Sequence, residues 1–304
     1  MQHLLAASAR SFLKRLCASA GAVKIFQGKG IKSMPQAEYI LGHSEREIQR
    51  LIHQAAILRP ITERLLHEIG LRPGMRVLDL GCGAGDVSML AAELVGSSGA
   101  VIGIDRNPEV LNVARERCRE AKLKQVEFKE TSLESLTEVI PFDAVVGRYV
   151  LLHQADPIAF LRAAAAQVRP GGILALHEIG HFGEVAETYR GTLILRQVRE
   201  WLLEFFQSGL PHFDVGQRLV EHFYMAQLPQ PRMFCELPVG GGSDSSITDW
   251  MVETLETVLP QLIKAGVITK EIDIEALRAD IADEVREARL QVVGPAQICG
   301  WIRV

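Results

Sequence analysis

The stretch "VLDLGCGAGD", residues 77–86, decides the fold. An apolar run leads straight into glycines at positions 81, 83 and 85, and a helical stretch begins at about Asp86. Glycines in such a turn let the chain reverse tightly and bring its backbone close to a ligand. The order of strand, glycine loop and helix therefore predicts an α/β fold with a ligand at this turn.

The spacing of the glycines restricts the kind of ligand. A dinucleotide fingerprint needs a glycine where Asp86 stands, and an acidic residue at a helix start repels a pyrophosphate. No Gly-Lys-Ser/Thr follows, which excludes a P-loop. Asp105 ends the next apolar run, 20 residues after Gly85, the offset expected of a carboxylate that binds ribose hydroxyls. The loop therefore suits a nucleoside without phosphates.

Five apolar runs alternate with helical stretches around this loop. The expected strands lie at 76–81, 100–105, 125–130, 142–148 and 172–179. The expected helices between them lie at about 86–95, 108–121 and 157–168. Asn107-Pro108 and Asp156-Pro157 each supply an N-cap followed by a proline at the first helical position. This alternation predicts βαβ units and a parallel sheet.

Helical patterns dominate the two flanks of this region. Before the loop, the pattern of 44–58 is expected to end where Pro60 separates it from a second helix. After residue 181 the expected helices lie at about 185–208, 214–227, 247–265 and 273–292. Strands are expected at 232–239 and 296–304.

Composition and charge exclude several classes of protein. The chain of 304 residues is 48% hydrophobic and 23% charged, which is typical of a globular protein, and its net charge of −4 argues against a nucleic-acid partner. Its five scattered cysteines, without a C-x-x-C, suggest neither a disulfide framework nor a structural zinc site. No apolar run approaches the roughly 18–20 residues that span a bilayer. We expect a cytoplasmic protein.

The first 37 residues differ from the rest of the chain. They contain no Asp or Glu, and they carry several Lys and Arg residues. Their apolar residues are spaced as on one face of an amphipathic helix. Such a stretch is typical of an organelle-targeting peptide, which leaves that localisation open. The alternative is a flexible or vector-derived extension, with Met34 as the original start.

Four stretches together resemble one enzyme family. "VLDLGCGAG", "VIGIDRN", "FDAVVGR" and "VRPGGIL" resemble the class I S-adenosylmethionine-dependent methyltransferases over roughly residues 76–180. "YILGHSEREIQRLIHQA" resembles a small-molecule subgroup related to the menaquinone/ubiquinone-type enzymes. The resemblance implies a Rossmann-like, doubly wound sheet of seven mostly parallel strands with an antiparallel last strand. It also implies S-adenosylmethionine as cofactor and S-adenosylhomocysteine as product.

The domain then spans 38–304, and its surplus of helix suggests a helical cap. We expect cap segments near 38–60, 185–208 and 246–292, which would close over the cofactor and exclude water. A homodimer interface formed by these helices is the competing interpretation.

The resemblance also assigns roles around the glycine loop. Gly81, Cys82 and Gly83 would pass under the methionine and ribose of the cofactor. Asp79 would hold its ammonium group, and Asp105 would accept hydrogen bonds from both ribose hydroxyls. An alternative interpretation of Cys82 is a small residue that fills space in the core.

Four further positions are implied farther along the chain. Arg106 would flank the adenine, and the backbone N–H of Leu133 would bind the adenine ring. Ser132 stands where many relatives have an Asp that accepts from the adenine amino group. Arg148 matches the position that orients the methionine end, although an ordinary ion pair explains it equally well.

"LALHEIGH", residues 174–181, contains His177, Glu178 and His181 in the H-E-x-x-H spacing of zinc proteases. That motif needs a helix, whereas this stretch follows "RPGG" and is expected to be a strand. We therefore predict no metal. At the carboxyl end of a parallel strand, these three side chains should point toward the mouth of the substrate cleft.

The acceptor is expected to be a small organic molecule. "GRYVLL" after the fourth strand lacks the Asp/Asn-Pro-Pro-Tyr of nucleic-acid methyltransferases. A hydroxyl acceptor needs a general base, for which His153, His177 and His181 are the candidates. The choice between O-, N- and C-methylation stays open. The alternatives are a non-enzymatic cofactor-binding protein on the same fold and a zinc hydrolase.

Overall fold

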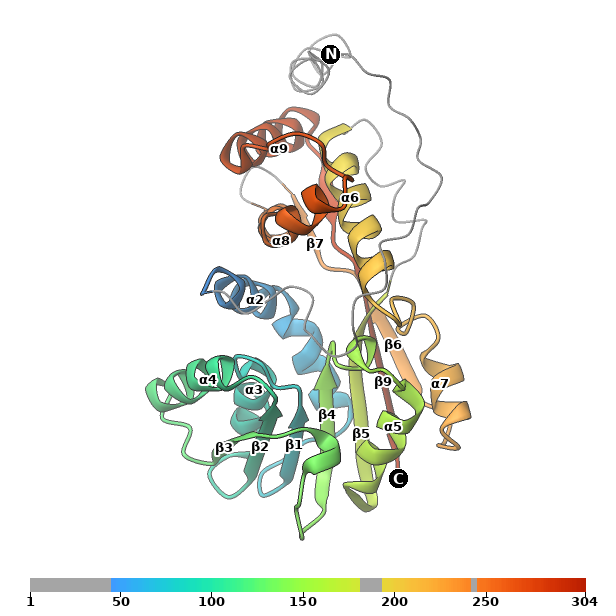
Figure 1. Ribbon diagram of the computed structural model, residues 1–304. Helices are drawn as coiled ribbons and strands as arrows, with labels where there is room; N and C mark the ends of the chain where they lie inside the picture. Colours follow the sequence, from blue (N-terminus) through green and yellow to red (C-terminus); the bar gives the residue numbers. More distant parts are fainter. Residues whose placement is uncertain (1–44, 181–192, 242–244) are drawn as a thin grey trace. The chain divides into compact units, whose positions relative to one another are not determined.

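The computed structural model describes residues 45–180, 193–241 and 245–304 (Figure 1). These residues belong to two compact units. The core unit lies within Gly42–His181, Pro211–Glu236 and Ala296–Val304, and the helical unit lies within Phe182–Leu210 and Leu237–Pro295. The expected extension at 1–37 and the start of the first cap segment lie outside the described residues.

A seven-stranded sheet forms the centre of the core unit. Its order is β3-β2-β1-β4-β5-β9-β6. Only the pairs of β9 with β5 and with β6 are antiparallel, so the expected doubly wound sheet with an antiparallel last strand is confirmed. The strands are β1 (Arg76–Leu80), β2 (Ala100–Asp105), β3 (Val126–Glu130), β4 (Phe142–Arg148), β5 (Val168–Gly180), β6 (Arg232–Glu236) and β9 (Ala296–Arg303).

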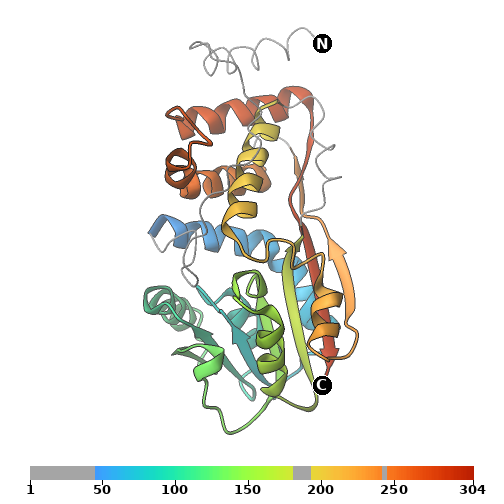
Figure 2. The same ribbon diagram turned by 45° about the vertical axis from the view of Figure 1, so that its right-hand side comes forward.

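Helices cover both faces of this sheet. The helices of the core unit are α2 (Glu45–Glu68), α3 (Asp86–Val95), α4 (Pro108–Glu120), α5 (Pro157–Ala166) and α7 (Leu219–Met225). Apolar side chains of α2 and α3 pack on alternate residues of the strands, among them Val77, Val146 and Ala175. α5 and α7 lie together on the opposite face (Figures 1 and 2). The carboxyl ends of β1, β2 and β4 are thereby left to the loops that carry the site.

The two predicted N-caps are confirmed. The Asn107 side chain accepts from the backbone N–H groups of Glu109 and Val110 at the start of α4. The Asp156 side chain does the same for Ile158 and Ala159 at the start of α5. In both cases proline takes the first helical position, where no donor is lost.

The prediction that Pro60 separates two helices is wrong. α2 runs without a break from Glu45 to Glu68 with Pro60 inside it. A proline in a helix interior costs about 3 kcal/mol. Here the Pro60 ring lies on the exposed face, while Leu58, Ile61 and Leu65 are buried on both sides of it. Tertiary packing of these neighbours overrides the local penalty.

Several other boundaries differ from those expected. The strand expected at 172–179 begins already at Val168, and the helix expected at 273–292 ends at Ala288, before a short strand at Gln291–Val293. α7 covers only Leu219–Met225 of the helix predicted at 214–227. The strand predicted at 232–239 is divided: β6 ends at Glu236, and β7 (Val239–Gly241) belongs to the helical unit.

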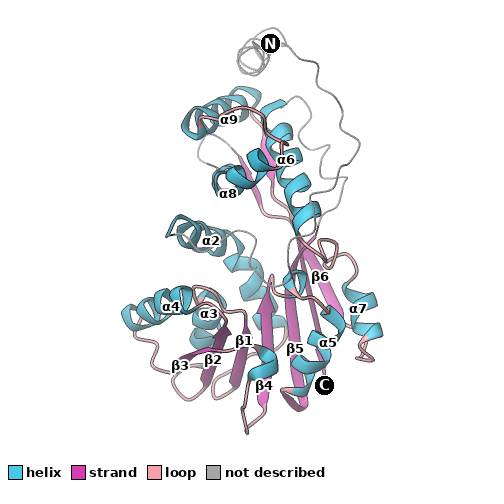
Figure 3. Ribbon diagram, in the orientation of Figure 1, coloured by secondary structure: helices cyan, strands magenta, loops and turns pink. Residues whose placement is uncertain are grey.

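The helical unit has a small core of its own. α6 (Leu193–Gly209), α8 (Ser246–Lys264) and α9 (Ile274–Ala288) pack together, beside a two-stranded antiparallel sheet of β7 and β8 (Gln291–Val293) (Figure 3). An ion pair between Arg278 and Asp249, 2.6 Å, joins α9 to α8. Among the helices that the structure describes, none is long and apolar enough to cross a membrane.

Candidate functional site

The glycine loop joins β1 to α3 at the carboxyl edge of the sheet. Gly81 and Gly83 have φ values of +60° and +52°, a region that residues with a Cβ rarely adopt. A Cβ on Gly81 would lie 2.7 Å from Cγ1 of Val150, so this glycine allows the loop after β4 to approach. A Cβ on Gly83 would meet nothing within 4 Å. The backbone at Gly83 therefore borders open space.

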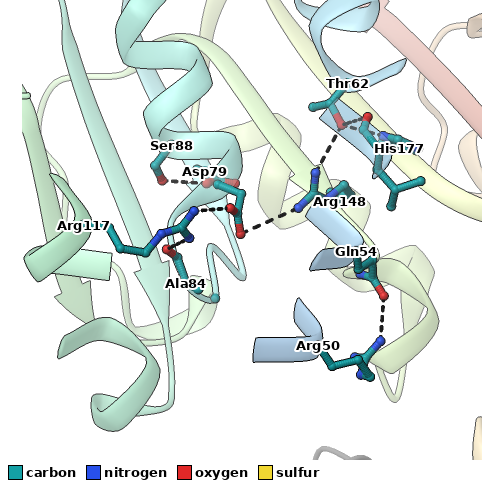
Figure 4. A network of polar contacts seen from close by, with 12 residues as sticks. Arg50, Gln54, Thr62, Asp79, Ala84, Ser88, Arg117, Arg148 and His177 are labelled. Atoms are coloured by element: carbon teal, nitrogen blue, oxygen red, sulfur yellow. Dashed lines mark hydrogen bonds and ion pairs between the residues drawn. The ribbon is translucent and has the colours of Figure 1, made fainter. Parts of the chain in front are cut away.

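Asp79, on β1 just before the loop, has one satisfied and one unsatisfied oxygen. Its carboxylate is 1% exposed, and Oδ2 accepts a hydrogen bond from Oγ of Ser88, 2.6 Å away (Figure 4). Oδ1 is buried and has no hydrogen-bond partner among the described residues. Burial raises the pKa of Asp79 to about 7, against the Ser88 hydrogen bond and the charge of Arg148, which lower it. A buried, unpaired carboxylate oxygen suits a cationic ligand group such as an ammonium.

Asp105, at the end of β2, ties the glycine loop to the next helix. Its Oδ2 accepts from the backbone N–H of Gly83 and its Oδ1 from that of Asn107, each at 3.0 Å. A carboxylate offers about four acceptor positions, so both oxygens can still accept from ligand hydroxyls. The structure thus fixes this carboxylate beside the open space at Gly83.

The predicted adenine-side residues lie near Asp105. The backbone N–H of Thr131 donates to the carbonyl of Asp105 across β2 and β3, 3.0 Å, and the chain then continues into Ser132 and Leu133. Leu133 is buried in the 3-10 helix η1 (Leu133–Ser135), and Oγ of Ser132 lies 3.3 Å from Oγ of Ser135. Arg106 is exposed and pairs with Glu134 at 3.3 Å.

Cys82 lies beneath the loop. It is buried in an apolar cluster with Leu111, Ala114, Cys118 and Phe128. Burial raises the pKa of its thiol well above the ordinary value. Cys82 is therefore a packed, neutral thiol, as expected of a space-filling residue.

Arg148, the last residue of β4, connects the loop to α2. Its Nη1 donates to Oγ1 of Thr62, 3.3 Å away, and its Nη2 lies 4.0 Å from Oδ2 of Asp86 (Figure 4). Asp86 also pairs with Arg117 at 2.7 Å. The sequence suggested only that Asp86 repels phosphate, and the structure adds that this carboxylate holds two arginines.

His177 lies at the centre of a buried contact chain. Its Nδ1 is 3.1 Å from Oγ1 of Thr62, and its Nε2 is 2.9 Å from Oε1 of Gln297. The hydroxyl of Tyr149 donates to the same Oε1 at 2.7 Å. Burial lowers the pKa of His177 to about 3. Both ring nitrogens are engaged within the protein, so His177 has neither exposure nor a nitrogen to offer a substrate.

Glu178 faces the other side of β5. Its Oε1 accepts from the backbone N–H groups of Val150 and Leu151, at 3.1 and 2.8 Å, which start the 3-10 helix η2 (Leu151–His153). Burial raises the pKa of Glu178 to about 8, while these backbone hydrogen bonds lower it. The side chain braces the loop that carries Arg148 and His153.

The first residues of the H-E-x-x-H motif lie on a strand and not on a helix. His177 and Glu178 belong to the strand β5, as expected, so the helix that the motif requires is absent from this stretch. The expectation that they face a cleft mouth is wrong, since the two side chains are 1% and 0% exposed. His181 lies outside the described residues. Within the described ranges, no group of three or more His, Cys, Asp or Glu is placed to hold a metal ion.

His153 ends η2, after the loop braced by Glu178. Its side chain is half-buried, and burial lowers its pKa to about 4. The imidazole is therefore neutral near pH 7, and burial makes it a weaker base than a free histidine.

Sequence reasoning missed Thr62, Tyr149 and Gln297. Paired residues of neighbouring strands point to the same face, and Arg148 is paired with His177 while Ile179, two residues on, is paired with Gln297. The register thus brings these side chains together opposite Thr62 of α2. Tyr149 has a φ of +55°, which marks a strained loop, but neither feature leaves a local trace in the sequence.

Comparison with known proteins gives a consistent result. The methyltransferase-domain family matches residues 71–207. The chain is 42% identical over 106 residues to a ubiquinone biosynthesis O-methyltransferase of Xanthomonas campestris pv. campestris strain B100, a match covering 34% of this chain and 43% of the relative. It is 29% identical over 161 residues to a demethylmenaquinone methyltransferase of Lactococcus lactis subsp. lactis strain IL1403, covering 53% and 64%.

The first of these matches spans less than half of the relative's own length, and the second less than two thirds. Among solved structures, a protein from Bacillus halodurans C-125 shares the fold, with a TM-score of 0.52 at 18% identity over 80% of this chain and 97% of that one. Together with the glycine loop, Asp79 and Asp105, these matches identify residues 71–207 as a class I S-adenosylmethionine-dependent methyltransferase domain, related to those of the quinone methyltransferases.

Proposed function

We propose that this chain transfers a methyl group from S-adenosylmethionine to a small organic acceptor. The observation that carries the proposal is the pair of carboxylates around the glycine loop. Asp79 offers a buried, unpaired oxygen, and Asp105 offers two oxygens beside the open space at Gly83. Asp79 on β1 and Asp105 at the end of the neighbouring strand β2 suit a ligand with an ammonium group at one end and a ribose at the other.

The residues present fit the cofactor without any metal. Asp79 would bind its ammonium, Asp105 its ribose hydroxyls, and the backbone at Gly83 would lie under both. The cofactor supplies a methyl group on a cationic sulfonium, ready for in-line displacement. The protein's part is to hold that group and the acceptor in line, an effect that can account for about 7–11 kcal/mol of the barrier.

A phenolic acceptor is the first class to test. One relative is named a ubiquinone biosynthesis O-methyltransferase and another a demethylmenaquinone methyltransferase, which supports a quinone-like ring. We propose His153 as the general base, because it is half-buried whereas His177 is fully buried and enclosed by Thr62 and Gln297. The base would take the hydroxyl proton of the acceptor as the methyl group is transferred.

Calorimetry with S-adenosylhomocysteine tests the cofactor site. Asp105→Asn removes the charge that would strengthen two ribose hydrogen bonds, so we expect a loss of about 1.5–3 kcal/mol, or roughly 10- to 150-fold in Kd. Glu116→Gln is the matched control, since this exposed carboxylate on the neighbouring helix α4 pairs only with Arg119 among the contacts described. Equal affinity of the Asp105→Asn variant and the wild type would refute the assignment.

A mass-shift assay on small phenols tests the transfer step. We expect the wild type to add one methyl group, and His153→Asn to slow this step by about 100-fold or more at unchanged affinity for S-adenosylhomocysteine. A variant that keeps its full rate would exclude His153 as the base and leave positioning as the source of catalysis.

A further inference from the structure

A continuous chain of polar side chains runs from β9 to the cofactor site. It starts at Tyr149 and Gln297, passes through His177 and Thr62, and ends at Arg148. Figure 4 shows the part of this chain from His177 through Thr62 to Arg148. All its members belong to the core unit. The chain joins four elements that are far apart in sequence, namely α2, β4 with its following loop, β5 and β9.

The chemistry of the acceptors fixes the direction of the hydrogen bonds. The amide oxygen of Gln297 can only accept, so Nε2 of His177 carries the proton. In a neutral ring Nδ1 is then an acceptor, 3.1 Å from the hydroxyl of Thr62. The one proton of this hydroxyl can be donated to Nδ1 or to the carbonyl of Leu58, 3.2 Å away. In either case its oxygen keeps a lone pair for Arg148.

Arg148 is held on a strained segment. The next residue, Tyr149, has a φ of +55°, which persists only where the surroundings enforce it. Its hydroxyl is fixed by Gln297, and its backbone N–H donates to the carbonyl of His177 at 2.9 Å. From the other face of β5, Glu178 holds the N–H groups of Val150 and Leu151. Arg148 therefore has little freedom to move.

Asp79 of β1 is paired with Val146 of the neighbouring strand β4, and Arg148 is two residues on, so the side chains of Asp79 and Arg148 project from the same face of the sheet. Three charged groups influence the Asp79 carboxylate: Arg148 favours its ionised form, whereas Asp86 and Asp105 oppose it. Ser88 donates a hydrogen bond to it, and the thiol of Cys82 beside it is neutral. Arg148 is thus the cation that acts on a carboxylate which must be ionised to bind an ammonium.

We propose that Thr62, His177 and Gln297 are positioning residues, which hold the Arg148 guanidinium where it keeps Asp79 ionised for the cofactor's ammonium group. This inference rests on the proposed function. The three residues touch neither cofactor nor acceptor, and they act through Arg148. The His177-Glu178 pair that resembled a zinc motif therefore has a different role. His177 orients Arg148 through Thr62, and Glu178 holds the loop that follows Arg148.

The test compares two buried threonines that differ in one respect. Thr62→Val removes the hydroxyl that meets Arg148 and His177, whereas Thr62→Ser keeps it. Thr254→Val is the matched control, because Thr254 is also buried within a helix and its Oγ1 donates only to the carbonyl of Trp250, 2.7 Å, among the contacts described. Arg148→Met gives the upper limit of the effect.

The readout is the affinity for S-adenosylhomocysteine between pH 6 and pH 8.5. Because the pKa of Asp79 is raised to about 7, wild-type affinity should fall below that pH. Loss of the Arg148 charge should raise this midpoint by about one pH unit. Arg148→Met should then bind about tenfold more weakly at pH 6 and less than about twofold more weakly at pH 8.5, and Thr62→Val should shift the midpoint in the same direction by a part of that amount. Thr62→Ser and Thr254→Val should follow the wild type.

Two results would overturn the inference: an unchanged midpoint in Thr62→Val, or an equal loss at every pH, which indicates general damage. Should Thr62→Val fail to fold, Gln297→Met removes the far end of the same chain and is judged by the same shift. Carboxyl ¹³C NMR of Asp79 in the ligand-free protein gives an independent measure. If the wild type binds no S-adenosylhomocysteine, the proposed function fails, yet the NMR midpoint must still rise in Thr62→Val for the inference to stand.

Discussion

Two buried glutamates perform the same task in the two units of this protein. In the core unit, Glu178 accepts from the N–H groups of Val150 and Leu151 at the start of η2. In the helical unit, Glu284 of α9 accepts from the N–H of Leu193 at the start of α6, 2.8 Å. In each, the second carboxyl oxygen is buried and has no hydrogen-bond partner among the described residues. Burial raises the pKa of both groups, that of Glu178 to about 8.

The difference between them lies in what each one holds. Glu178 fixes a loop whose neighbours, Arg148 and His153, belong to the candidate site. Glu284 fixes the first turn of a helix that packs within its own unit. A carboxyl group from a distant element can therefore replace the usual N-cap, and whether it serves function depends on the segment that it caps. Neither role is visible in the sequence.

The largest effect is expected from removing the carboxyl groups. Glu178→Leu leaves two buried N–H groups without their acceptor, at about 1–3 kcal/mol each, so we expect a loss of roughly 2–6 kcal/mol in the free energy of unfolding. Glu284→Leu removes one such contact among those described, and we expect about 1–3 kcal/mol. Urea unfolding measures both.

The tryptophans separate the two units in this experiment. Trp301 lies on β9 in the core unit, whereas Trp201 and Trp250 lie on α6 and α8 in the helical unit. Fluorescence of a Trp301→Phe background therefore reports the helical unit, and a Trp201→Phe/Trp250→Phe background reports the core. Equal losses for the two glutamates would show that the number of capped N–H groups does not set the cost.

A smaller effect, with a defined pH dependence, is expected for Glu178→Gln. The folded pKa of about 8 lies above the unfolded value near 4.5, so the folded state binds the extra proton between these values. Stability should therefore fall as pH rises from about 5 to 8, by at most about 1.4 kcal/mol per pH unit. Glutamine keeps the accepting oxygen and cannot ionise, so the variant should lose this part of the slope.

The measurement is the free energy of unfolding at pH 5.5 and 7.5 for both proteins. The free energy of unfolding of the variant, relative to that of the wild type, should increase by about 2–3 kcal/mol from pH 5.5 to pH 7.5. Glu116→Gln, on the surface of α4, is the control for a change of net charge. A constant difference between variant and wild type at the two pH values would mean that Glu178 is ionised in the folded protein.

The core fold could be predicted because its determinants are local. Asn107-Pro108 and Asp156-Pro157 mark helix starts by their own chemistry, and each predicted strand from β1 to β4 is found within about a residue. Pro60 shows the limit of this reasoning, since a local penalty was outweighed by the buried residues around it. The helical unit was harder to delimit, because it is built from two separate insertions, one after β5 and one between β6 and β9.

The residues of the site likewise fall into those that the sequence predicted and those that it could not. Asp105 follows from its offset after the glycine loop, whereas the role of Asp79 is implied by the family resemblance. The structure places both carboxylates near that loop. Thr62, Tyr149 and Gln297 could not be found, because their contacts depend on the register of β4, β5 and β9 and on the packing of α2. The family match ends at residue 207, so it carries no information on the insertion at Leu237–Pro295.

The smallest expected effect concerns the role of the helical unit, for which the sequence suggested a cap over the cofactor. If α6, α8 and α9 close on the cofactor site in solution, S-adenosylhomocysteine should slow the amide exchange of these three helices by a few-fold, as well as that of the core unit. The effect should be independent of protein concentration. Asp105→Asn serves as the control, since a protein that cannot bind the ligand should show no slowing.

The competing interpretation is an interface between two copies of the chain. In that case the protection of the same helices should rise with protein concentration and should not depend on the ligand. Protection confined to the core unit under both conditions would contradict both interpretations, and would leave Glu284 and the helices that it holds together as a separately folded unit without a part in binding.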